Sequence, residues 1–126
     1  MSLHISLDAA RTVATAAATM RTLATPTTAP ALDVAVWRTD LPAGSAGPPH
    51  VIDGDQLVVV VDGTLTVQVD DTGREVAAGD AVLLPGGSQR VLGAAGGRPA
   101  TTLTVGRPNA MATVGDGEPV LVPWTA

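Results

Sequence analysis

The frequent interruption of short apolar runs by glycine and proline is the feature that most constrains this chain. Its 126 residues include 14 Gly and 10 Pro. Both residues disfavour helices, so a helical bundle is excluded, whereas short strands joined by tight turns tolerate them. The longest unbroken apolar run, residues 57–61, is far too short to span a membrane. The length fits one domain, and we expect it to be all-β.

Two segments show the strand pattern most clearly. Residues 56–61 contain a continuous apolar stretch that is suited to a strand buried on both faces. Residues 64–69 alternate apolar and polar side chains, as in a strand with one buried face. The hairpin turn at residues 70–73 is expected to place Gly73 at positive φ. This succession predicts an antiparallel sandwich or barrel, with further strands around residues 34–37, 74–77, 81–84, 89–92, 101–105 and 119–122.

Composition excludes several functions. The chain has no Cys, which excludes disulfides, thiolate nucleophiles and iron–sulfur clusters, and no Lys, which excludes a Schiff base or a P-loop. Two His cannot fill a three-histidine metal site. A net charge of −5 and scattered Arg residues argue against a nucleic-acid partner. The N-terminus does not resemble a signal peptide, so we expect a cytoplasmic protein with no membrane association.

The N-terminal quarter is the segment with the least regular pattern. Residues 1–32 are rich in Ala and in β-branched Thr, without a helix cap or a clean apolar stripe. We expect one or two strands or an extended arm here, packing on the barrel or on a partner subunit. Residues 33–126 are expected to form the barrel itself.

Two spaced motifs in the middle of the chain resemble the motif pair of the cupin family. The first motif has a Gly, five intervening residues, a His and later a closing Gly. The second has Gly, Pro-x-Gly and a last functional position. The resemblance covers residues 44–94 and is carried by Gly44, His50, Gln56, Gly63, Gly79, Pro85, Gly87 and Arg90. It implies an antiparallel jelly-roll β-barrel, a double-stranded β-helix with a pocket between its sheets.

The residues at the family's metal-ligand positions differ from the usual ones. Cupins usually hold one divalent metal with two His, a Glu and a third His. The resemblance places His50, Ile52, Gln56 and Arg90 at these positions. Ile52 has no donor atom, and a protonated guanidinium cannot bind a metal. We therefore expect no cofactor and a degenerate metal site; if a divalent metal is bound, His50 and Gln56 would be its ligands.

The altered residues suggest a different occupant for the pocket. An arginine fork suits a carboxylate, and glutamine can both donate and accept hydrogen bonds. We hypothesise that His50, Ile52, Gln56 and Arg90 line a pocket that binds a small, anionic or amide-bearing organic molecule without a metal, in a non-catalytic or sensing role.

Two alternatives stand beside this hypothesis. The chain could be a cupin enzyme, a metal-assisted oxygenase or an isomerase, with His50 as the only candidate base. It could also be a structural protein whose former metal site is repacked core. Arg90 would then point outwards or pair with Asp53, Asp55 or Asp80.

The resemblance also implies a partner. Small cupins commonly form homodimers through sheet edges, and an extended arm can add a strand to a neighbouring subunit. Residues 12–25 are the candidate segment for such an arm. We therefore expect a homodimer.

Overall fold

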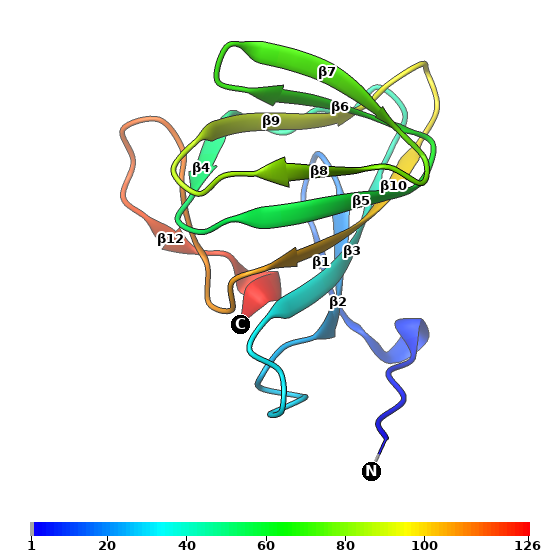
Figure 1. The fold of residues 1–126 in the computed structure, drawn as a ribbon, viewed down its shortest axis with the longest axis vertical. Helices are drawn as coiled ribbons and strands as arrows, with labels where there is room; N and C mark the ends of the chain where they lie inside the picture. The colour runs from blue at the N-terminus through cyan, green and yellow to red at the C-terminus, as the bar shows by residue number, and fades with distance from the viewer. Residues whose placement is uncertain (1) are drawn as a thin grey trace.

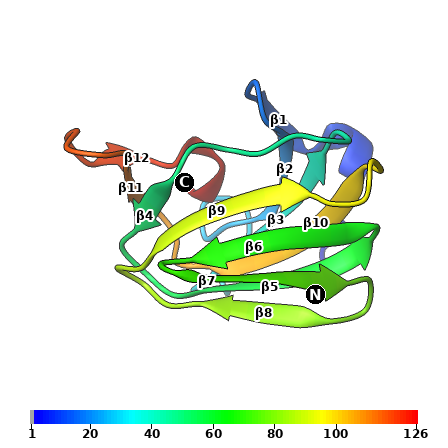
Figure 2. The same cartoon turned by 90° about the horizontal axis from the view of Figure 1, so that it is seen from above.

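Two antiparallel six-stranded sheets face each other in the computed structural model, which describes residues 2–126. Figures 1 and 2 show the sheets from two directions, and the core lies between them. The strands are joined by short turns, and the only helical segments in the described part of the chain are the 3-10 turns η1 (Leu7–Ala9) and η2 (Pro123–Thr125). The prediction of an all-β jelly-roll barrel is confirmed.

The first sheet, sheet A, contains both strands of the N-terminal segment. Its spatial order is β1 (Arg11–Ala14), β2 (Thr19–Ala24), β3 (Ala35–Leu41), β10 (Ala100–Gly106), β5 (Gln56–Asp62) and β8 (Ala81–Leu84). Strand β2 pairs with β3 of the same chain. Residues 12–25 are therefore part of this chain's own sheet.

The second sheet, sheet B, holds the remaining strands. Its order is β12 (Val120–Leu121), β11 (Met111–Thr113), β4 (His50–Ile52), β9 (Gln89–Ala94), β6 (Thr64–Val69) and β7 (Thr72–Ala77). The apolar residues of β6 face the core, as the alternation predicts: Leu65 and Val67 are buried. Within the described residues, no helix is long and apolar enough to cross a membrane.

Strand β5 differs from its prediction, because only one of its faces is buried. Val58 and Val60 are each 1% exposed, whereas Leu57 is 42% exposed and Val61 is 49% exposed. The apolar run was predicted to be buried on both sides. The prediction is wrong because nothing in residues 2–126 covers the outer face of sheet A at these positions.

The hairpin between β6 and β7 also differs from its prediction. Val69 pairs with Thr72, so the turn has only two residues, Asp70 and Asp71. Positive φ falls on Asp70 (φ 50°), while Gly73 is a regular strand residue. Aspartate tolerates this conformation, and Asp70 Oδ1 also accepts a hydrogen bond from the Gln89 amide at 3.1 Å.

Gly63 allows the chain to pass close to the start of β10 at the end of β5. Its φ is +74°, and a Cβ atom at this position would collide with the carbonyl oxygen of Pro99 and lie 3.0 Å from Ala100 Cα. Gly79 has a similar φ of +93° but open space around it. Replacing Gly79 with a larger residue therefore costs only backbone strain, whereas replacing Gly63 adds a steric clash to that strain.

We expect Gly63→Ala to destabilise the protein much more than Gly79→Ala. The control variant should lose about 1–2 kcal/mol, the usual cost of a left-handed residue with a Cβ. Gly63→Ala should lose roughly 1–3 kcal/mol more, because the strands must separate. Urea unfolding of both variants measures the difference, and equal losses would contradict the role of close strand approach.

Candidate functional site

Three strands position the four residues predicted for the pocket. His50 and Ile52 lie on β4, Gln56 begins β5, and Arg90 lies on β9. His50 and Arg90 are direct cross-strand partners in the antiparallel β4–β9 pair. Gln56 comes from the opposite sheet and meets Arg90 across the barrel interior, where Arg90 Nη1 donates to Gln56 Oε1 at 3.2 Å.

Arg90 lies inside the barrel and has no exposed surface. Besides Gln56, its guanidinium donates to two backbone carbonyls, with Nη2 at 2.8 Å from Pro85 O and at 3.2 Å from Ser88 O. Nε donates to the same Ser88 oxygen at 3.4 Å. Every one of these acceptors is electrically neutral. The alternative in which Arg90 points outwards is therefore wrong.

The turn that supplies these carbonyls was not predicted as part of the site. Ser88 Oγ donates to Pro85 O at 2.6 Å, and Asp55 Oδ1 accepts from the Gly86 amide at 2.7 Å. These bonds hold the turn in place beside Arg90. The only sequence signal for this turn was the turn-forming Pro-Gly-Gly run at residues 85–87. Its role as an acceptor could not be predicted, because every residue has a backbone carbonyl.

Two aspartates near the site have structural roles. One of the alternatives paired Asp53 or Asp55 with Arg90. Asp53 instead accepts from the Met111 amide at 3.0 Å and pairs with Arg107 at 3.2 Å, and Asp55 binds the 85–88 turn. Among residues 2–126, no carboxylate lies within ion-pair distance of Arg90.

Burial affects the pKa of Arg90. Loss of hydration lowers the pKa of the guanidinium, and the more distant carboxylates of Asp55 and Asp70 partly oppose this effect. Arginine stays protonated even under such conditions, so the barrel interior carries a positive charge.

His50 is half-buried, and its pKa depends on this burial and on two neighbours. Its Nδ1 lies 3.0 Å from Pro48 O, and because a carbonyl only accepts, Nδ1 is the nitrogen that carries hydrogen. The Nε2 lone pair is then free when the ring is neutral. Burial lowers the pKa of His50, the bond to Pro48 raises it, and the positive charge of Arg90 lowers it further, with a net decrease.

Ile52 lies in a different environment from His50, Gln56 and Arg90, which we call the Arg90 group. It is 4% exposed and packs in a small apolar cluster with Ala110 and Val122. Trp124 packs against this cluster and against the main core. The structure thus brings His50, Gln56 and Arg90 together, whereas Ile52 contributes hydrocarbon to the neighbouring core.

The donor set does not fit a divalent metal of the kind that the cupin resemblance implies. Ile52 has no ligand atom, Arg90 places a positive charge at the centre, and the Gln56 carbonyl oxygen already accepts from that charge. Only the Nε2 atom of His50 remains. No group of three or more metal-binding side chains occurs in the part of the chain that the structure describes.

Two surface hollows lie away from this group. One, of about 1150 Å³, runs along the edge strands β7 and β8, and the other, of about 480 Å³, lies near residues 15–17 and 44–48. Neither is lined by His50, Gln56 or Arg90. Arg90 and Gln56 are buried, whereas His50 is half-buried.

Comparison with known proteins identifies one family. Residues 37–106 match the model of the cupin domain. No curated protein matches the sequence.

Solved structures share the fold at low sequence identity. A protein of unknown function from Streptococcus pyogenes is 24% identical, with a TM-score of 0.59 over 70% of this chain and 71% of that one. A polyketide cyclase from Streptomyces resistomycificus is 20% identical, with a TM-score of 0.71 over 87% and 84%. Oxalate decarboxylase from Bacillus subtilis is 17% identical, with a TM-score of 0.74 over 85% of this chain but only 30% of that one.

A double-mutant cycle on Arg90 and Gln56 should show strong coupling. Arg90→Met leaves the Gln56 carbonyl oxygen buried without a donor, and Gln56→Met leaves a guanidinium N–H without an acceptor. Each variant should lose about 1–3 kcal/mol of unfolding free energy, and the double variant should lose at least about 1 kcal/mol less than the sum. Arg74→Met, on the exposed face of β7, is the matched control. Additive losses would show that the two side chains do not interact.

The stability of the protein should fall as the pH is lowered through the ordinary pKa of histidine, near 6.5. The folded-state pKa of His50 is lowered, so the unfolded chain binds more protons in this range and stability rises with pH, by at most about 1.4 kcal/mol per pH unit. His50→Asn keeps a donor for Pro48 O but does not titrate. Its unfolding free energy between pH 8 and about 5.5 should vary less than that of the wild type; identical profiles would contradict this.

Proposed function

Because the chain belongs to the cupin domain family, we propose that it uses the cupin barrel to bind a small anionic organic molecule, without a tightly held metal and in a non-catalytic or sensing role. The observation that carries the proposal is the fully buried guanidinium of Arg90, which has no carboxylate partner among residues 2–126.

A buried charge with only neutral partners is unfavourable, because the protein does not replace the lost hydration completely. An anion beside Arg90 would supply the missing negative charge. A carboxylate is the best chemical match, since its two oxygens fit the planar donors of a guanidinium. Nη1 has room for a second bond, because it carries two hydrogens and donates only to Gln56 Oε1.

Gln56 controls access to Arg90 in this arrangement. Arg90 has no exposed surface and Gln56 Oε1 already accepts from Nη1, so a carboxylate reaches this nitrogen when the Gln56 side chain moves aside. The displaced amide then has its own donor hydrogens available for the ligand. Exchange of a neutral acceptor for a charged one strengthens the hydrogen bond to the guanidinium.

His50 adds pH dependence to this binding. Its cross-strand position beside Arg90 brings the free Nε2 atom to the same region. An anion bound there would offset the charge of Arg90 and so raise the pKa of His50. Uptake of a proton by His50 and binding of the anion therefore favour each other.

Binding of acetate and benzoate tests the proposal. By calorimetry and amide chemical shifts, we expect weak binding to the wild type, about tenfold tighter binding to Gln56→Ala, which makes room, and none to Arg90→Met. Arg74→Met should bind like the wild type. Affinity should rise as the pH falls below about 6.5, and His50→Asn should lose this rise. Equal binding by the wild type and a folded Arg90→Met would overturn the proposal.

A metal-assisted or isomerase-type enzyme is the second candidate function. It is favoured by one observation, the free Nε2 lone pair of a histidine whose pKa is lowered, which is the state that a general base needs. Elemental analysis of untagged protein separates the two functions. A stoichiometric transition metal that is lost in His50→Ala would favour the enzyme over the metal-free binding protein.

A further inference from the structure

Gly106 leaves the inner face of sheet A without a side chain next to Gln56. It ends β10 and pairs with Gln56 on one neighbouring strand and with Ala35 on the other. The position points inward, since every second residue of β10 is buried and Gly106 is one of them. A glycine within a strand often marks a place where another group comes close to the backbone.

Two side chains occupy the space over Gly106. A Cβ atom on this residue would lie 3.2 Å from Gln56 Cγ and 3.4 Å from Trp37 Cη2. Trp37 belongs to β3, is 4% exposed and packs in the main core, so its ring has a fixed place. The apolar stem of Gln56 therefore lies on the Gly106 backbone, beside the edge of the indole.

The two parts of the Gln56 side chain have separate partners. Its carbonyl oxygen accepts from Arg90 Nη1 at 3.2 Å, and its stem contacts the region between Gly106 and Trp37. When this side chain moves aside, it leaves a space with a cation at one end and an apolar wall along the rest. A carboxylate that is joined to a hydrocarbon group matches both parts.

The shape of this space favours a flat hydrocarbon group. The Gln56 stem packs directly on Gly106, because even one added carbon atom would be only 3.2 Å from it. The space that the stem leaves is therefore shallow on this side, and a flat ring fits it better than a puckered one. The indole edge beside it carries the positive rim of an aromatic ring, which attracts the face of another ring.

We propose that the ligand of the Arg90 group is a carboxylate carried directly on a flat, unsaturated group, as in an aromatic acid, and that Gly106 and Trp37 select it. This inference rests on the proposed function, since it names the class of anion that Arg90 binds. The carboxylate takes the place of the Gln56 amide at Arg90 Nη1. The flat group lies on Gly106, against the edge of Trp37.

Three acids of equal charge test the selection. Acetate has the carboxylate alone, benzoate adds a flat ring, and cyclohexanecarboxylate adds a puckered ring with the same number of carbons. In Gln56→Ala, where the space is open, calorimetry should give benzoate an affinity about tenfold higher than that of either other acid. Equal affinities for the two ring acids would overturn the inference.

An added methyl group tests the role of Gly106. This glycine does not have positive φ, so Gly106→Ala reduces the space without straining the backbone. Gln56→Ala removes the nearest contact of the new methyl group, so the double variant should fold. Compared with Gln56→Ala, it should bind benzoate about tenfold more weakly, and the ratio of benzoate to acetate affinity should fall.

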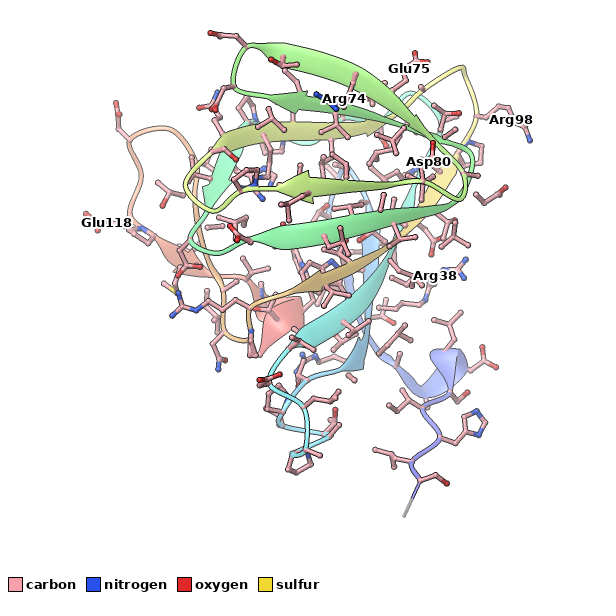
Figure 3. All side chains as sticks on the ribbon, viewed as in Figure 1. Arg38, Arg74, Glu75, Asp80, Arg98 and Glu118 are labelled. Carbon is pink, nitrogen blue, oxygen red and sulfur yellow. The ribbon has the colours of Figure 1, made fainter. Side chains whose placement is uncertain are left out.

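Gly73→Ala in the same background is the matched control. Gly73 lies on the edge strand β7 without positive φ, and a Cβ atom there would meet nothing within 4 Å. Figure 3 labels its neighbour Arg74. This variant should bind all three acids like Gln56→Ala. A loss of benzoate preference in Gly73→Ala as large as that in Gly106→Ala would overturn the role of Gly106.

Tryptophan fluorescence reports the contact with Trp37. The chain has two Trp, so Trp124→Phe leaves Trp37 as the only one. When Gln56→Ala is added, benzoate should change the emission and saturate at the dissociation constant from calorimetry, whereas acetate should not. Addition of Arg90→Met corrects for non-specific quenching. Constant emission while benzoate binds would contradict the proposed place of the ring.

These measurements separate the inference from the proposed function. Acetate binding that depends on Arg90, without any preference for benzoate, overturns the inference and leaves the proposed function standing. Absence of Arg90-dependent binding of all three acids overturns the proposed function, and the inference with it.

Discussion

The buried guanidinium of Arg90 is the interaction on which the barrel interior depends. It joins β9 to β5 through Gln56 and to the 85–88 turn through two backbone carbonyls. In a metal-binding cupin a cation at this place would connect the same elements through its ligands, as the resemblance implies. Here the cation is covalently part of the chain. Its permanent charge disfavours a metal ion and favours an anion.

The same charge influences the residues around it. His50 lies directly opposite Arg90, and this neighbour adds to the effect of burial in lowering the histidine pKa. Asp55 lies too far away to form an ion pair but binds the turn that supplies the carbonyls. The site is therefore a positive centre that is held by neutral acceptors, and this supports the proposed preference for an anionic ligand.

Much of the fold could be predicted from local patterns, whereas the site could be predicted only in part. The alternation in β6 is confirmed, and the motif glycines Gly63 and Gly79 take positive φ, because strand periodicity and turn conformation are properties of short segments. The two-residue turn at Asp70 was not predicted, since aspartate and glycine can both take that conformation. The role of Pro85 and Ser88 could not be predicted, because they act through backbone atoms.

The sequence by itself determined the all-β barrel, through glycine and proline at turn positions, and the replacement of metal ligands by Ile52, Gln56 and Arg90. Only the tertiary structure decided that Arg90 is sealed inside with neutral partners and that one side of β5 stays uncovered. The physical reason is that alternation along a strand is local, whereas burial depends on what packs across it. That packing comes from segments far away in the chain.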